Sequence, residues 1–172
     1  SAALFMALAA MAVRTLAREV REPGDLLARA NSLLCERNRT NQFVTACAVI
    51  LNPATGEIVW ANAGHPLPAR LSASGEVTWL EGARCAPLGV FEETRYRTER
   101  GVLNPGETLV IYSDGVTEAD DPAGRLFGAP RLIEALGGSP ATSADAALTR
   151  VVAAVHAFAG TAPQADDITV IA

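Results

Sequence analysis

Residues 108–119 read Thr-Leu-Val-Ile-Tyr-Ser-Asp-Gly-Val-Thr-Glu-Ala, an apolar run that ends in a short polar and acidic segment. The β-branched and aromatic residues of 108–112 predict a strand, and Ser113, Asp114 and Gly115 follow directly after it. A carboxylate just beyond a strand end is held on rigid backbone and remains accessible to solvent. Gly115 would let the backbone turn sharply next to Asp114. This stretch therefore predicts a strand that presents an acidic side chain at its end.

A second acidic pair, Asp166-Asp167, stands near the end of the chain. It precedes Ile168 to Ala172, which we expect to form a closing strand. Several carboxylates that converge from strand ends make an all-oxygen site, which suits Mg²⁺ or Mn²⁺. On pattern alone, however, Asp-Gly after a strand is most often a turn, and the Asp pair could simply end a loop. The residues by themselves leave both interpretations open.

The rest of the chain predicts helices at both ends of a group of strands. Helices are expected at 2–20, 25–37, 130–137 and 143–160, and strands at 43–51, 57–61, 67–71, 76–80, 108–112 and 168–172. Asp25 and Ser143 are expected to cap their helices, and Gly160 to end the last one. The first turns of helix 2–20 are expected to be buried, because charged residues begin only at Arg14. This order is typical of an α+β layered domain.

Composition excludes several classes of function. The 172 residues are 49% hydrophobic and 19% charged, which indicates one globular domain. The net charge of -5 argues against a nucleic-acid-binding surface, which needs a basic patch. Three cysteines in no zinc-binding pattern favour a reducing compartment, so a cytoplasmic location is expected. The longest apolar stretch, residues 2–13, is too short to span a bilayer.

Several motifs together resemble a known family. They are Phe43-Val44-Thr45, Asn62-Ala63-Gly64-His65-Pro66, Pro87-Leu88-Gly89, Leu103-Asn104-Pro105-Gly106-Glu107, Tyr112 to Ala119, Phe127-Gly128 and Asp166-Asp167-Ile168-Thr169. Their order resembles the stage II sporulation protein E-like branch of the PPM (type 2C-like) metal-dependent serine/threonine phosphatases. The resemblance implies a β-sandwich flanked by helix pairs, in four layers α/β/β/α. It also implies that residues 1–172 are one partial phosphatase domain without its N-terminal strands.

The resemblance also implies a site and a chemistry. In the family, two divalent ions, Mn²⁺ or Mg²⁺, hold a water that attacks the phosphorus of phosphoserine or phosphothreonine, and no protein nucleophile is required. By match, Asp114 and Asp166 would bind the same ion, with carboxylates about 4–6 Å apart. Asp167 and Gly115 would support these ligands, and Glu118 could orient metal-bound water. His65 could act as a general acid, but its place in a turn after a strand favours a structural role.

The chain also departs from the family pattern. Family members carry an Asp-x-x-Gly-His-Gly-like segment just before the helix that here begins at Ala2, and its Asp bridges both ions. Because the sequence begins at Ser1, we expect at most one partial ion site, and little or no activity from this chain alone. The alternative is an inactive module that binds a phosphoprotein or regulates another protein.

The resemblance implies partners as well. The substrate would be a phosphorylated anti-sigma-factor antagonist or another bacterial regulatory phosphoprotein, which places the protein in signal transduction and sigma factor regulation. A sensor or receiver domain would lie upstream in the full-length protein, and a homodimer is left open. No nucleic acid and no membrane contact are expected for this segment.

Overall fold

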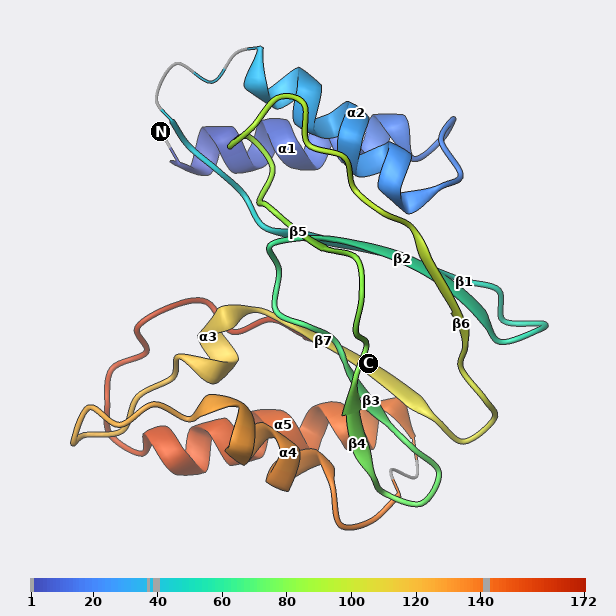
Figure 1. Ribbon diagram of the computed structural model, residues 1–172. Coiled ribbons are helices and arrows are strands. Elements are labelled where there is room, and N and C mark those ends of the chain that lie inside the picture. The colour runs from blue at the N-terminus through green and yellow to red at the C-terminus, as the bar shows by residue number, and fades with distance from the viewer. Residues whose placement is uncertain (1, 37, 39–40, 141–142) are drawn as a thin grey trace. The chain divides into compact units, whose positions relative to one another are not determined.

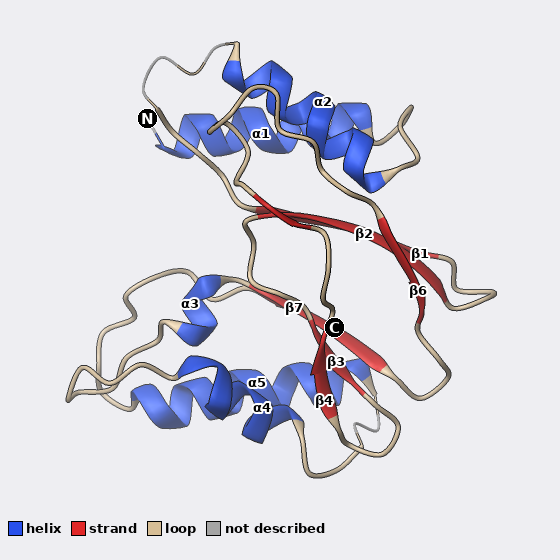
Figure 2. Ribbon diagram, viewed as in Figure 1, coloured by secondary structure: helices blue, strands red, loops and turns tan. Residues whose placement is uncertain are grey.

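The computed structural model describes residues 2–36, 38, 41–140 and 143–172. The chain forms two compact units, residues 1–65 with 81–102, and residues 66–80 with 103–172. Each unit contains one four-stranded sheet and helices that pack on it. Figure 2 shows helices and strands in both units, so the predicted α+β class is confirmed. Of the described helices, none is long and apolar enough to cross a membrane.

The first unit pairs two helices with a sheet built around β2. Its elements are α1 (Ala2–Leu16), α2 (Pro23–Cys35), β1 (Ala46–Leu51), β2 (Glu57–Ala63), β5 (Arg84–Cys85) and β6 (Glu99–Val102). β2 pairs antiparallel with β1 and β6 and parallel with β5. α1 packs on α2, and α2 packs on β1 and β2 (Figure 1). The unit's core joins Phe5, Leu27 and Leu34 of the helices to the sheet residues Ala61 and Ala63.

Helix α1 differs from its prediction in two ways. It ends at Leu16, before the expected Val20, and the chain continues in a turn. The expected burial of its first turns is wrong for one face: Phe5 and Ala9 are buried, whereas Leu4 and Met11 are two-thirds exposed. The reason is that only the face carrying Phe5 and Ala9 joins the core cluster of the unit.

Helix α2 begins two residues earlier than predicted. Pro23 stands at the first helical position, Glu22 is the N-cap without a side-chain cap, and Asp25 lies in the first turn, so it is not the cap. Proline starts a helix well because its φ is preset and the N–H that it lacks would have no helical partner. The helix ends at Cys35; the expected end, Arg37, lies outside the described residues.

A buried amide on α2 holds a loop that the sequence did not reveal. Asn31 is fully buried. Its Nδ2 donates to the carbonyls of Phe91 (2.8 Å) and Glu92 (3.1 Å), and its Oδ1 accepts from the backbone N–H of Gly89 (2.8 Å). A buried amide costs little free energy only when it is paired in this way. Asn31 therefore fixes the loop that carries the Pro87-Leu88-Gly89 motif.

The second unit carries the acidic segments of interest. Its elements are β3 (Ala69–Leu71), β4 (Val77–Trp79), β7 (Thr108–Tyr112), α3 (Asp114–Thr117), α4 (Gly128–Leu136), α5 (Ala144–Ala159) and β8 (Val170–Ile171). The sheet order is β4-β3-β7-β8, with every pair antiparallel. α5 packs on α4 and on strands β7 and β8 (Figure 1). Val110 of β7 and Val151 and Val155 of α5 are fully buried in this core.

Several predicted boundaries in this unit are confirmed. β7 spans the predicted residues, and the side chain of Ser143 caps α5 by accepting from the backbone N–H of Ala146 (3.1 Å). Gly160 ends α5 with a positive φ of 56°, which is unfavourable for residues with a side chain. α4, however, begins at Gly128 rather than Pro130.

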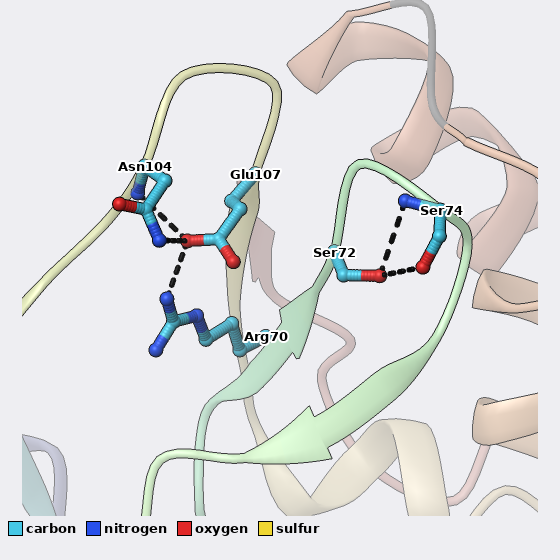
Figure 3. Close-up of polar contacts among 5 residues, drawn as sticks. All are labelled: Arg70, Ser72, Ser74, Asn104 and Glu107. Carbon is cyan, nitrogen blue, oxygen red and sulfur yellow. Dashed lines mark hydrogen bonds and ion pairs between the residues drawn. The ribbon is translucent and has the colours of Figure 1, made fainter.

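A carboxylate network joins β3 to the turn before β7, as Figure 3 shows. Oε2 of Glu107 accepts from Arg70 Nη2 (2.5 Å), from the backbone N–H of Asn104 (2.7 Å) and from Asn104 Nδ2 (3.1 Å). The backbone N–H of Glu107 donates to the Asn104 carbonyl (3.0 Å), which closes the predicted turn at Pro105-Gly106. Burial alone would raise the pKa of Glu107, but the hydrogen bonds from Arg70 and Asn104 outweigh it and lower the pKa below its usual 4.5.

Replacing Glu107 by Gln is expected to destabilise the protein by about 1–3 kcal/mol at neutral pH, because Arg70 and the turn lose a charged acceptor. A carboxyl with a lowered folded-state pKa stabilises the fold above its unfolded pKa, and that contribution disappears as pH falls through the folded pKa. The difference in melting temperature between wild type and Glu107→Gln should therefore shrink below about pH 4.5. Glu76→Gln, at an exposed position of the same unit, is the control. A difference that stays constant down to pH 3 would contradict this account.

Candidate metal centre

The pairing of β7 with β8 brings the two acidic segments together. Asp114 follows β7, and Asp166 and Asp167 precede β8. The strands are antiparallel, with Tyr112 opposite Val170, so the end of β7 lies beside the beginning of β8. In Figure 1 the red chain after α5 passes beside α3 on its way to β8. Residues more than fifty positions apart in the sequence thus meet at one edge of one sheet.

Hydrogen bonds of Ser113 connect the segment after β7 with the segment before β8. The backbone N–H of Ser113 donates to the Thr169 carbonyl (2.9 Å), which extends the strand pairing by one residue. Its Oγ donates to the carbonyl of Asp167 (2.9 Å) and accepts from the backbone N–H of Thr169 (3.0 Å). The sequence showed Ser113 only as the neighbour of Asp114. Its role depends on the register of β7 with β8, which no local pattern reveals.

Gly115 is needed for close approach of the backbone rather than for a sharp turn. It is a helical residue of α3 and does not have a positive φ, so the expected reason for this glycine is wrong. A Cβ at this position would lie 2.4 Å from the carbonyl oxygen of Asp167 and 3.0 Å from its carbon. Both are well inside van der Waals contact. The absence of a side chain at Gly115 therefore allows the Asp114 segment to lie directly against the Asp166–Asp167 segment.

The carboxylates of Asp114 and Asp166 are both exposed and oriented by local hydrogen bonds. Oδ1 of Asp114 accepts from the backbone N–H of Gly115 (3.1 Å), and Oδ1 of Asp166 accepts from the backbone N–H of Asp167 (2.7 Å). Gln164 Nε2 donates to the Asp166 carbonyl (2.8 Å). These groups offer oxygen donors, which fit Mg²⁺ or Mn²⁺. That Asp114 and Asp166 share one ion stays a prediction.

The other predicted residues lie on the same segments. Glu118 follows α3 with an exposed side chain, and its backbone N–H donates to the Asp114 carbonyl (2.8 Å). Asp167 is exposed, and its carbonyl is held by Ser113. Within the described parts of the chain, no group of three or more acidic, histidine or cysteine side chains is arranged to hold an ion. A complete ion site would therefore need ligands beyond those of this set.

The two histidines occupy different units. The backbone N–H of His65 donates to Asn62 Oδ1 (2.8 Å), Asn62 Nδ2 donates to the His65 carbonyl (3.0 Å), and Nδ1 of His65 lies 3.2 Å from Thr45 Oγ1. These contacts within the first unit fit the structural role that its turn position favours. His156 is an exposed residue of α5 in the unit of Asp114.

The fold is similar to that of solved PP2C-type phosphatase domains. The SiaA-PP2C domain of Pseudomonas aeruginosa matches with a TM-score of 0.80 and 25% identity, covering 98% of this chain and 68% of that chain. The SpoIIE phosphatase domain of Bacillus subtilis (Mn presoaked) matches with a TM-score of 0.63 and 16% identity, covering 92% and 68%.

The sequence places the chain in a family. The model for "Stage II sporulation protein E (SpoIIE)" matches residues 1–172, so the chain belongs to this family of PP2C-type serine/threonine phosphatases. The phosphoserine phosphatase RsbU of Bacillus subtilis is 26% identical over 125 residues, which are 73% of this chain and 37% of RsbU. The chain thus spans well under half of RsbU. The resemblance inferred from the motifs is confirmed.

Proposed function

We propose that this chain is the larger part of the catalytic domain of a protein serine/threonine phosphatase. Its substrate would be a phosphoserine or phosphothreonine of a bacterial regulatory protein, of the anti-sigma-factor antagonist type. The proposal is supported by the pairing of β7 with β8, which joins the Asp114 and Asp166 segments at one sheet edge. The phosphoserine phosphatase activity in the name of RsbU supports the substrate class.

Asp114 and Asp166 are the proposed ligands of one Mn²⁺ or Mg²⁺ ion. Such an ion lowers the pKa of a bound water and neutralises charge on the phosphoryl oxygens. The chain's own residues hold the ligands in place: Ser113 ties the Asp167 carbonyl to the end of β7, and Gly115 allows the two segments to touch. Glu118, one helical turn after Asp114, could orient water near the ion. The SpoIIE phosphatase domain named above was presoaked with Mn, which supports this choice of ion.

The remaining ligands are proposed to come from residues upstream of Ser1, because the resemblance places a bridging Asp there. An upstream sensor or receiver domain, a homodimer and a cytoplasmic location belong to the same proposal. A phosphoprotein-binding or regulatory module without turnover is the second candidate.

The test compares the 172-residue chain with the full-length protein in Mn²⁺ titrations. An aryl phosphate and a phosphoserine peptide are the two substrates. We expect Mn²⁺-dependent hydrolysis by the full-length protein and little or none by the chain alone, because a two-ion mechanism requires the bridging carboxylate. Comparable turnover by both would show that our account of the upstream ligands is wrong. No turnover by either, at any Mn²⁺ concentration, would favour the binding module.

A further inference from the structure

A cavity of about 320 Å³ opens between α3, the end of α5 and the loop that leads to β8. This volume is in the range of pockets that bind small ligands. Its apolar wall includes Val155 and Ala159 of α5, and three carboxylates line it as well, those of Glu118, Asp120 and Asp166. The cavity therefore combines an apolar wall with acidic groups, and it reaches Asp166, a proposed ion ligand.

The net negative charge of the chain lies in the unit that contains this cavity. Residues 66–80 and 103–172 hold ten Asp and Glu side chains and four Arg, a formal charge of -6, compared with -5 for the whole chain. None of the four arginines lines the cavity. Arg70 pairs with Glu107, and Arg125 pairs with Asp121. Arg131 and Arg150 donate to backbone carbonyls, those of Leu126 and Phe127 and those of Leu136, Ser139 and Pro140, respectively.

His156 of α5 also lines the cavity, but the carboxylates of Glu118 and Asp120 form no ion pair with it or with the four arginines. Across the residues that the structure describes, neither accepts a hydrogen bond or forms an ion pair. A carboxylate beside an apolar wall attracts a cation more strongly than one in open water. An arginine or lysine side chain fits both features, because its aliphatic stem packs on apolar groups while its charged head pairs with carboxylates.

We propose that this cavity receives an arginine or lysine side chain of the phosphorylated protein substrate, near the phosphoserine in its sequence. The inference rests on the proposed function, since Asp166 both lines the cavity and is a proposed ion ligand. In this proposal one substrate chain places its phosphoserine at the ion and its basic side chain in the cavity. The cavity would therefore select substrates by sequence, whereas the ion acts on the phosphate alone.

The experiment uses the full-length protein with Mn²⁺ and phosphoserine peptides in an alanine and glycine background. One position at a time, on either side of the phosphoserine, carries arginine or its neutral isostere citrulline. At one position arginine is expected to raise kcat/KM about tenfold over citrulline, the effect of one charge-assisted hydrogen bond. Asp120→Asn should remove most of this ratio. Glu134→Gln, an exposed acid of α4 that does not line the cavity, should leave the ratio unchanged.

A charge exchange adds a result that a general loss of activity or stability cannot produce. Asp120→Arg should prefer a peptide with glutamate at the selected position over one with arginine. Equal kcat/KM for arginine and citrulline at every position would overturn the inference, while hydrolysis of an aryl phosphate would leave the proposed function intact. An equal loss of the ratio in Glu134→Gln would also overturn it, because general acidity of the unit would then explain the preference. If neither substrate is hydrolysed, the proposed function fails and the inference with it.

Discussion

Asp114→Asn and Asp166→Asn are each expected to lower Mn²⁺-dependent hydrolysis of a phosphoserine peptide by the full-length protein about a thousandfold. Asparagine keeps the size of the side chain but removes the charge that would hold the ion. An ion that stabilises transition-state charge supplies several kcal/mol, and each 1.36 kcal/mol changes the rate tenfold. The measurement is kcat/KM over a Mn²⁺ titration. Asp145→Asn, an exposed Asp in the first turn of α5, is the matched control.

The double variant tests whether the two carboxylates share one ion. Groups that act as a unit have strongly non-additive effects. If Asp114 and Asp166 hold the same ion, the double variant should be about as inactive as either single variant. A loss of kcat/KM in the double variant equal to the product of the two single losses would argue against the shared site. So would two single variants that each keep at least a tenth of the activity at an unchanged Mn²⁺ requirement.

Local chemistry explains which elements could be predicted. β7 is a short run of β-branched and aromatic residues, and Ser143 and Gly160 have the side chain and the conformational freedom that helix ends require. β5 and β6 were not predicted, because their few residues include charged and small side chains. They form strands only because they pair with β2, and long-range pairing overrides local propensity.

In the candidate site, too, local features could be predicted from the sequence and long-range contacts could not. The sequence could point to Asp114 and Asp166 as acidic residues at strand ends, and the motif order joined them in one hypothesis. It could not show that Ser113 bonds to the Asp167 carbonyl, because that contact follows from the register of strands far apart in the chain. Nor could it give the reason for Gly115, since a glycine needed for close approach looks the same in sequence as a glycine needed for a turn.

Gly115→Ala is expected to destabilise the protein by about 3 kcal/mol and to weaken Mn²⁺ binding by the full-length protein at least tenfold. The new Cβ would lie 2.4 Å from the Asp167 carbonyl oxygen, and this neighbour is backbone that cannot rotate away. The Asp166–Asp167 segment must therefore move from Asp114, which separates the proposed ligands. Chemical denaturation and calorimetric Mn²⁺ titration measure the two effects.

Two further variants separate ligand displacement from general destabilisation. At Gly124 a Cβ would meet nothing within 4 Å, but φ is +73°, so Gly124→Ala should cost about 1–2 kcal/mol of stability and leave Mn²⁺ affinity unchanged. Ser113→Ala removes the bond to the Asp167 carbonyl without adding an atom; it should cost about 1 kcal/mol and still weaken Mn²⁺ binding. This milder variant covers the case in which Gly115→Ala does not fold. Normal Mn²⁺ affinity in both Gly115→Ala and Ser113→Ala would mean that the contact between the two segments does not position the ion ligands.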